Sequence, residues 1–399
     1  MPGWDVLAPF QPNNVIFATM SKKILIIYDY FTPAFKAGGP IQSITNLVRW
    51  LAYRYDFYVL TRNVDLDGTT LDVKSDQWLD FEGKARVFYA SGQNTGYRPV
   101  ARIIKEVGPD VVYINGLFSL FATVFPLLFN MRSGDQNRRF VIAPRGMFQQ
   151  GALALKAMKK KVFLMGMKPL MKRPNIRWHA TDDQEKRDIL QTMGEDALVK
   201  MAGNVPAVLK EDVENHFEGD VLRLVTVALV VRMKNHLAFL KALEKYRGDR
   251  RIVYDIYGPV KDPEYWRECE QVIDKLPEMV EVRYQGAVEP PRVPGILAGY
   301  HAYVLPTFGE NFGHSIFEAL AAGLPVLISD KTPWQNLEEE GAGWGFNLEK
   351  KGDFERVFDE LKSATSEELK KKGEKAKKLA DKYLEKAGLE ESYEALFSL

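Results

Sequence analysis

The sequence predicts an α/β protein with two doubly wound parallel-sheet domains. At 399 residues the chain is too long for one ordinary hydrophobic core. Short uncharged runs recur along it, and segments with helical spacing follow many of them. This alternation is typical of parallel sheets with helices on both faces. We place one domain at 22–205 and the other at 206–384. A final helix at about 385–399 is expected to pack back on the first domain.

The first domain opens with residues 24–28 (ILIIY), an uncharged run typical of a strand buried on both faces. The pair Gly38 and Gly39 follows in a loop, before a helix predicted over 41–51. Glycines there let the backbone approach a ligand closely, although loop geometry alone also explains them. The other elements predicted in this domain are strands at 57–60, 86–89, 111–114 and 140–143 and a helix at 100–107.

The alternation breaks at 203–219, which marks the domain boundary, and then resumes. Ligands on open α/β sheets bind outside the carboxyl ends of the strands, so the loops there should form a site. The predicted elements of the second domain are strands at 222–229, 252–257, 280–284, 302–305 and 326–328, a helix at 234–246 and a charged amphipathic region at 355–382; the final helix, at 389–399, follows this domain.

Composition excludes several classes of function. The net charge of +1 gives no support to bulk nucleic-acid binding, so we expect no nucleic-acid partner. The single Cys269 cannot form an internal disulfide, which fits a reducing, cytoplasmic compartment. The five histidines lack metal-ligand spacing, so we expect no metal site and no cofactor. Residues 1–21 lack the features of a signal peptide and are set apart as an N-terminal extension, with Met20 as an alternative start.

Two segments leave alternatives open. Residues 111–131 carry no charge, and a buried strand, glycine turn and helix explain them, with a transmembrane helix as the alternative. Residues 151–173 carry seven basic residues and no acid. They form either a surface for anionic membrane lipid or a lipid-phosphate acceptor, or a solvated basic helix face. In the first case the protein would lie peripherally at the cytoplasmic face of the membrane.

The stretch 302–334 combines a strand, a glycine-bearing loop, a helix and a second strand. Glu310 lies in the loop and Glu318 in the helix. The helix start near His314 and Ser315 offers backbone N–H groups to an anion. Cations and a helix N-terminus suit a diphosphate, and carboxylates suit vicinal hydroxyls; a nucleotide sugar presents both. The cations in the loop after 222–229 are Arg232 and Lys234.

This stretch, PTFGENFGHSIFEALAAGLPVLISD, resembles the E-x7-E signature of retaining GT-B glycosyltransferases of family 4. RMKNHLAFLKAL resembles the family's cation-bearing loop, and FTPAFKAGGPIQSITNLVRWLA its N-terminal glycine loop. PRGMFQQGALALKAMKKK is similar to a segment of bacterial surface-polysaccharide members. The resemblance implies two Rossmann-like domains facing across a cleft. It implies transfer of a sugar from a nucleotide-diphosphate donor to a glycan or lipid-linked acceptor with retention, without a metal, in cell-surface polysaccharide synthesis.

The resemblance also implies roles for individual residues. Glu318 would accept hydrogen bonds from ribose hydroxyls, Glu310 would contact the transferred sugar, and Lys234 would contact the phosphates together with Arg232. Backbone groups from Asn311 to Ser315 would meet the sugar and diphosphate. The remaining candidates are Phe312, Gly313, His314, Gly258, Gly38 and Gly39 for the donor, and Asn115 and Arg145 near the acceptor or the sugar.

The chain departs from the family pattern at several positions. Asn311 stands where glycine is common, and His314 where an apolar residue is common. The family's phosphate arginine usually lies five positions before the lysine, where this chain has Leu229. A histidine often follows the strand at 111–114, where this chain has Asn115, so no catalytic base is named. Two alternatives therefore stay open: a catalytically weak nucleotide-sugar-binding partner subunit, and a GT-B nucleotide-sugar epimerase.

Overall fold

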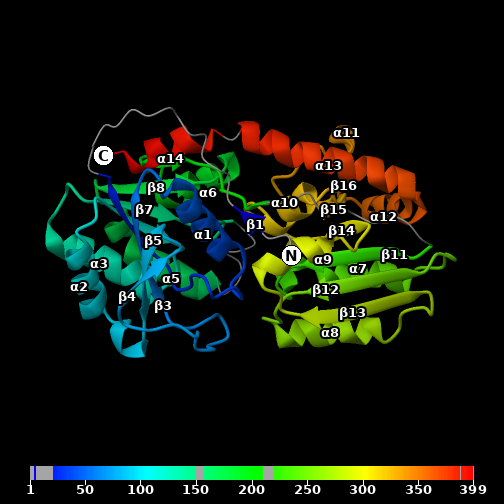
Figure 1. Cartoon of the computed structure of the whole chain (residues 1–399), viewed down its shortest axis with the longest axis horizontal. Helices are drawn as coiled ribbons and strands as arrows, with labels where there is room; N and C mark the ends of the chain where they lie inside the picture. The colour runs from blue at the N-terminus through cyan, green and yellow to red at the C-terminus, as the bar shows by residue number, and fades with distance from the viewer. Residues whose placement is uncertain (1–3, 6–20, 150–156, 210–219, 387, 399) are drawn as a thin grey trace. The chain divides into compact units, whose positions relative to one another are not determined.

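The computed structural model describes residues 4–5, 21–149, 157–209, 220–386 and 388–398 and divides the chain into two compact units (Figure 1). Unit 1 comprises Met1–Val6 and Pro206–Ala387, and unit 2 comprises Leu7–Val205 and Gly388–Leu399. Most of the predicted N-terminal extension, residues 1–3 and 6–20, lies outside the described residues. Each unit contains one predominantly parallel sheet with its own hydrophobic core, as expected from the alternation.

Unit 2 contains an eight-stranded sheet in the order β4-β5-β3-β2-β6-β7-β8-β9. Only the pairing of β4 with β5 is antiparallel. The chain leaves β2 toward β3 on one side and later adds β6 on the other, so the topological switch point lies between β2 and β6. The strands are β2 (Lys23–Ile27), β3 (Asp56–Arg62), β4 (Trp78–Phe81), β5 (Ala85–Ala90), β6 (Val111–Asn115), β7 (Arg139–Ala143), β8 (Ile176–Ala180) and β9 (Val199–Met201).

Two edge strands of this sheet, β4 and β9, were not predicted from the sequence. Both are short, and most of their residues are exposed or partly exposed. They therefore lack the continuous apolar run that marks the buried strands β2 and β6.

The helices of unit 2 cover its sheet, and α14 brings the end of the chain to this unit. The hydroxyl of Tyr393 in α14 donates to the carbonyl of Gly203 over 3.0 Å, and Phe397 contacts the ring of Tyr55. The helices are α1 (Gly39–Leu51), α2 (Tyr97–Val107), α3 (Phe125–Ser133), α5 (Ala157–Met171), α6 (Asp183–Met193) and α14 (Leu389–Phe397), with short turns η1 (Gly92–Asn94) and η2 (Leu120–Val124, a π-helix).

The uncharged stretch 111–131 folds as a strand, a turn and a helix. β6 ends at Asn115, Gly116 follows with φ 107°, and η2 and α3 then continue the chain. Within the described residues, no helix is both long enough and apolar enough to cross a bilayer. The glycine separates β6 from the helices that follow it, so the 21 uncharged residues form a strand and short helices instead of one long helix.

Unit 1 contains a six-stranded parallel sheet in the order β13-β12-β11-β14-β15-β16. Its switch point lies between β11 and β14. β16 was not predicted, because two of its four residues are glycines, which disfavour strands. The strands are β11 (Leu222–Val227), β12 (Ile252–Tyr257), β13 (Val280–Gly286), β14 (Ala302–Leu305), β15 (Val326–Ser329) and β16 (Gly343–Phe346), and β1 (Trp4–Asp5) pairs separately with β10 (Val208–Leu209).

The helix predicted at 234–246 is shorter in the structure. Lys234 belongs to a 3-10 turn, and Asn235 has a left-handed backbone with φ 56°, so α7 begins only at His236. The region 355–382 contains two helices rather than one continuous amphipathic segment. The helices and turns of unit 1 are η3 (Arg232–Lys234), α7 (His236–Glu244), α8 (Pro263–Ile273), η4 (Pro290–Arg292), α9 (Val293–Leu297), α10 (His314–Ala321), α11 (Leu337–Glu340), α12 (Asp353–Ser363) and α13 (Ser366–Lys386).

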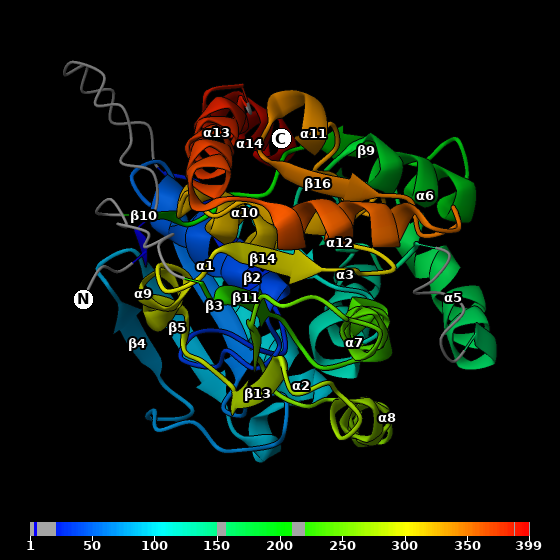
Figure 2. The ribbon, with the colours of Figure 1, turned by 90° about the vertical axis from the view of Figure 1, so that its right-hand side faces the viewer.

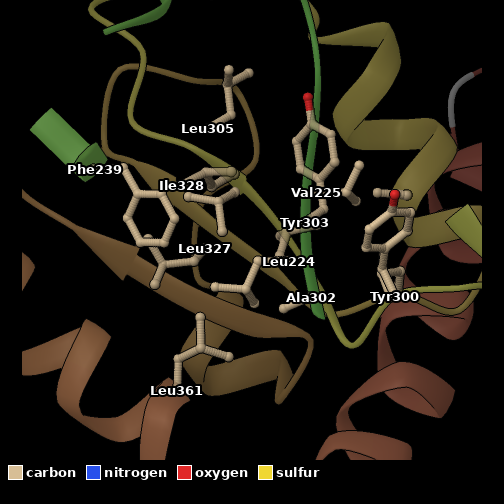
Figure 3. Close-up of a cluster of buried hydrophobic side chains, with 14 of the residues drawn as sticks. Leu224, Val225, Phe239, Tyr300, Ala302, Tyr303, Leu305, Leu327, Ile328 and Leu361 are labelled. Atoms are coloured by element: carbon tan, nitrogen blue, oxygen red, sulfur yellow. The ribbon is translucent and has the colours of Figure 1, made fainter. Parts of the chain in front are cut away.

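The core of unit 1 packs on both faces of its central strands. Side chains of β11, β14 and β15 interdigitate in Figure 3, and Phe239 of α7 and Leu361 of α12 lie on the same side as Leu327. Tyr303 of β14 is fully buried although it ends in a hydroxyl. Burial on both faces explains why β14 is an uncharged run, whereas β11 carries the exposed Arg223 near its start.

Gly258, just after β12, should not tolerate a side chain. Its φ of 141° is rare for other residues, and a Cβ atom would overlap the carbonyl oxygen of Ala228. We expect Gly258→Ala to lower the free energy of unfolding by about 1–3 kcal/mol from backbone strain alone. Gly295→Ala, in α9 with open space around the position, should be neutral or slightly stabilising. Urea unfolding of both variants measures the difference, and equal effects would contradict it.

Candidate functional site

Three loops meet at the carboxyl end of the unit 1 sheet. Phe308 N–H, in the loop after β14, donates to the carbonyl of Met233 in the loop after β11 over 2.8 Å. The Thr307 hydroxyl donates to the same carbonyl over 3.0 Å. Glu310 N–H donates to the carbonyl of Lys331, after β15, over 2.9 Å. The loops that follow the switch-point strands are therefore tied to one another by backbone groups.

Lys234 and Glu310 form an ion pair across two of these loops. The Lys234 ammonium donates to Glu310 Oε1, and the side chains are 19% and 11% exposed. A pair this sheltered from solvent is screened less than a surface pair. The structure therefore brings together a cation and a carboxylate that lie far apart in the sequence.

Helix α10 begins directly after this loop. Its N-cap, Gly313, has φ 76°, a left-handed backbone that favours glycine, and a Cβ there would lie 2.8 Å from Ile316 Cδ1. No side chain within the described residues caps this helix start. An uncapped N-terminus offers N–H donors and a partial positive charge to an anion. Ser315, in the first turn, has its hydroxyl 2.7 Å from the hydroxyl of Tyr303.

Aromatic side chains hold the loop that precedes α10. The Phe312 ring contacts the rings of Phe317, Trp334 and Tyr383, and Trp334 Nε1 donates to the carbonyl of Phe312 over 2.6 Å. Phe312 is only 6% exposed, so its side chain anchors the loop to the hydrophobic core of unit 1. The sequence reasoning missed this support, because Tyr383 lies on the distant helix α13 inside a Lys-rich segment.

Glu318 is a buried carboxyl group on α10, with 5% of its surface exposed. Its side chain accepts no hydrogen bond from the residues that the structure describes. Burial raises the pKa of Glu318 to about 8. Burial, and then the charges of Glu310 and Glu318, also raise the pKa of Tyr303, so both carboxylates lie near this one tyrosine. A desolvated carboxyl group without a partner is the kind of group that a ligand hydroxyl can satisfy.

The guanidinium of Arg232 contacts helix α8. Its guanidinium donates to Glu268 of α8, with NH1 3.1 Å from Oε2, and it lies over the ring of Tyr265. Asp262 lies 3.6 Å from its Nε. The described contacts therefore do not bring Arg232 into the Lys234–Glu310 pair, although both cations belong to η3.

Gly258 was predicted to contact the donor. The structure gives another reason for a glycine there: the chain after β12 packs against the backbone of Ala228 too closely for a Cβ. Its N–H donates to the carbonyl of Gly286 over 2.8 Å. Gly258 thus shapes the strand ends that surround the site.

The other candidates belong to unit 2. Gly38 is the N-cap of α1 with φ 70°, and Gly39 is the first residue of that helix. Asn115 ends β6 at the switch point, and its Nδ2 donates to the carbonyl of Pro40 over 3.4 Å. Arg145 follows β7 with φ 55°, a left-handed backbone that is uncommon for arginine. These four residues surround the carboxyl ends of neighbouring strands.

Arg145 is held by neutral acceptors. It donates to Asn115 Oδ1 over 2.8 Å, Asn204 Oδ1 over 2.8 Å and the hydroxyl of Tyr113 over 2.7 Å. The Tyr113 hydroxyl lies 2.7 Å from His179 Nδ1. Burial, and then the charge of Arg145, lower the pKa of His179 to about 3, so this histidine is neutral. The side-chain oxygen of Asn115 is therefore occupied by the hydrogen bond that it accepts from Arg145.

Residues 209–382 match the family model described as glycosyl transferases group 1. The matched residues lie within unit 1 and make up less than half of the chain. A curated relative, O-antigen chain mannosyltransferase B of Escherichia coli, is 29% identical over 103 residues. That match covers 25% of this chain and 26% of the relative, so it spans about a quarter of the relative's length.

Solved structures resemble the whole chain in fold. HepE of Anabaena, in complex with UDP and glucose, superposes with a TM-score of 0.70 at 16% identity, covering 95% of this chain and 100% of HepE. Sucrose-phosphate synthase of Thermosynechococcus elongatus gives 0.68 at 13% identity, with coverages of 94% and 99%. WaaG, a glycosyltransferase involved in lipopolysaccharide biosynthesis, gives 0.66 at 14% identity, also covering 94% and 99%. The chain therefore has the GT-B fold, as the sequence resemblance implied.

The buried Glu318 should make stability depend on pH in the free protein. Because its pKa is higher when folded (about 8) than the ordinary value of 4.5, ionisation opposes folding. We expect Glu318→Gln to gain stability relative to the wild type as pH rises from about 4.5 to about 8, by up to several kcal/mol. Below and above this window the difference should stay constant. Urea unfolding of both proteins across this range measures it, and a flat difference would contradict the assignment.

Proposed function

We propose that this protein is a retaining glycosyltransferase that moves a sugar from a nucleotide-diphosphate donor to a hydroxyl of a glycan or lipid-linked acceptor. The observation that carries the proposal is the buried, unpartnered Glu318 beside an uncapped helix start and the Lys234–Glu310 pair. All three lie where ligands bind on open α/β sheets. A role in cell-surface polysaccharide synthesis is supported by the likeness to O-antigen mannosyltransferase B, and a cytoplasmic location by the single Cys269.

Glu318 would accept hydrogen bonds from the ribose hydroxyls of the donor. A carboxylate accepts several hydrogen bonds, and vicinal hydroxyls can supply two. In the empty site the ionised form is destabilised by burial, so donation from hydroxyls stabilises the ionised carboxylate more than the neutral acid. Donor binding should therefore be accompanied by release of a proton near pH 7. The resemblance to the E-x7-E signature supports the same role.

Lys234 would contact the donor diphosphate while keeping Glu310 in place. An ammonium group carries three N–H donors, so Lys234 can bond Glu310 and a phosphate oxygen together. The second Glu310 oxygen is then available to a hydroxyl of the transferred sugar. The backbone of 311–315 and the start of α10 would add N–H donors where the leaving diphosphate develops charge.

Catalysis in this proposal depends on positioning and on stabilising the leaving group. The acceptor hydroxyl would attack from the face that the diphosphate leaves, which retains the anomeric configuration. Protein cations and helix N–H groups would offset the charge without a metal. Arg232 remains a candidate for phosphate contact, but it would have to leave Glu268 and Asp262 to reach one.

That engagement of Arg232 also favours a second function, a nucleotide-sugar-binding subunit with weak catalysis. With Leu229 at the position of the usual phosphate arginine, Lys234 would be left as the main side-chain cation on the diphosphate. Such a subunit would bind the donor through Glu318 and Lys234 but release little diphosphate. The two functions therefore share a binding site and differ in turnover.

Two measurements separate these functions. Binding to the folded state raises the melting temperature, so a screen of UDP-, GDP-, ADP- and dTDP-sugars should identify the donor by its shift. An active transferase should then release the nucleoside diphosphate when glycan or lipid-linked acceptors are added, with unchanged rate in the presence of a chelator. Binding without release under every acceptor would identify the subunit. An epimerase would instead interconvert the sugar of the donor, and no shift with any nucleotide sugar would contradict all three.

Substitutions at the loop cluster should weaken donor binding selectively. Lys234→Ala should cost about 1.5–3 kcal/mol in donor affinity, because a charge-assisted hydrogen bond to phosphate is lost. Glu318→Ala should weaken the nucleotide sugar but leave inorganic diphosphate unaffected, since it acts on the ribose. Lys241→Ala, on the exposed side of α7, is the matched control and should bind normally. Calorimetry measures all three, and normal affinity of Glu318→Ala would remove its assigned role.

A further inference from the structure

The outward face of helix α5 in unit 2 is unusually apolar. Met158, Val162 and Met165 are 75%, 57% and 73% exposed, and their spacing of four and three places them along one side of the helix. Figure 2 shows α5 at the edge of its unit. A solvated helix normally carries polar residues on this side.

The opposite side of α5 already serves the core. Met167 and Met171 are buried, and the Phe163 ring packs against Phe118 with centroids 5.3 Å apart. The exposed methionines and valine are therefore additional to the residues that the fold needs. Leu120, two residues after Phe118, is 66% exposed as well. Exposed apolar groups gathered on one element mark an interaction surface.

The charges around this face have one sign. The described part of α5 and the residues up to Arg173 include five lysines and no acid. Lys172 pairs with Asp196 and Lys160 lies over the Phe118 ring, whereas the exposed Lys159 and Lys161 have no acidic partner within the described residues. Apolar side chains interleaved with unpaired lysines complement a surface with an apolar interior and anionic headgroups.

We propose that this face of α5, defined by Met158, Val162, Met165, Lys159 and Lys161, docks unit 2 on an anionic lipid bilayer. The three apolar side chains enter the headgroup boundary, and the lysine stems extend so that the ammonium groups remain among the phosphates. Docking would place unit 2 where lipid-linked acceptors are found. The surface shares no residue with the donor site, so its test can fail while donor binding holds.

Flotation of the full-length protein with vesicles tests the proposal. Binding is expected to vesicles of phosphatidylcholine with 30% phosphatidylglycerol at low salt, to fall steeply as salt is raised, and to be absent with phosphatidylcholine alone. Replacing Met158, Val162 and Met165 together by Ser should reduce the partition coefficient at least tenfold without lowering the melting temperature. Lys159→Ala with Lys161→Ala should reduce it about thirtyfold.

A matched control lies in unit 1. Lys370→Ala with Lys378→Ala removes the same charge from exposed positions of α13 and should leave vesicle binding unchanged. Equal loss in the control would show nonspecific attraction and overturn the proposal, as would absence of binding to anionic vesicles at low salt. Self-association of the wild type that the triple Ser variant abolishes would identify a second copy as the occupant instead. Donor-induced melting shifts, measured in parallel, should be the same in all variants.

Discussion

The ion pair between Lys234 and Glu310 is the contact on which the proposed donor site depends. It joins side chains from the loops after β11 and β14, the two strands that border the switch point of unit 1. Hydrogen bonds from the Phe308 N–H and the Thr307 hydroxyl to the carbonyl of Met233 connect the same two loops. The two opposite charges offset each other, so the protein tolerates a cation sheltered from solvent. In the proposed function a donor diphosphate would contact an ammonium group that is already oriented, so less side-chain ordering would oppose binding.

Glu318 differs from this ion pair, because no described residue donates a hydrogen bond to its buried carboxyl group. Its burial on α10 raises its pKa to about 8, whereas a paired carboxylate would have its pKa lowered. Burial of Glu318 therefore lowers the free energy of unfolding at neutral pH, and a ligand that donates hydrogen bonds to this carboxyl group can offset the loss. Structural carboxylates in the same unit behave differently: Asp255 accepts hydrogen bonds from Arg283, Gln285 and Tyr300, and these bonds lower its pKa. The contrast distinguishes the carboxyl group that we propose binds the donor from a structural one.

The central strands and the loop cluster were predictable, because buried parallel strands give continuous apolar runs and their carboxyl ends converge. The sequence did not predict the elements and side-chain contacts that depend on tertiary packing. Edge strands β4 and β9 lack the apolar run, β16 is half glycine, and Asn235 adopts a left-handed backbone that starts α7 late. The sequence could not reveal that Arg232 would pair with Glu268, because any exposed acid on a neighbouring helix can capture a flexible guanidinium. Nor could it show Tyr383 supporting Phe312 from a Lys-rich helix.

Unit 2 uses a buried cation for a different purpose. Arg145 binds Asn115, Asn204 and Tyr113, and His179 continues the network to the carbonyl of Ala202 over 2.7 Å. Residues 202–205 are the last of unit 2 before the chain passes to unit 1, and Tyr393 of α14 bonds Gly203 after the chain has returned. One hydrogen-bond network thus anchors both segments that connect the units. Asn115 suits this position because its amide accepts a hydrogen bond from Arg145 and donates one to the carbonyl of Pro40 at the same time. A protonated histidine there would have no acceptor nitrogen and would lose the bond from Arg145.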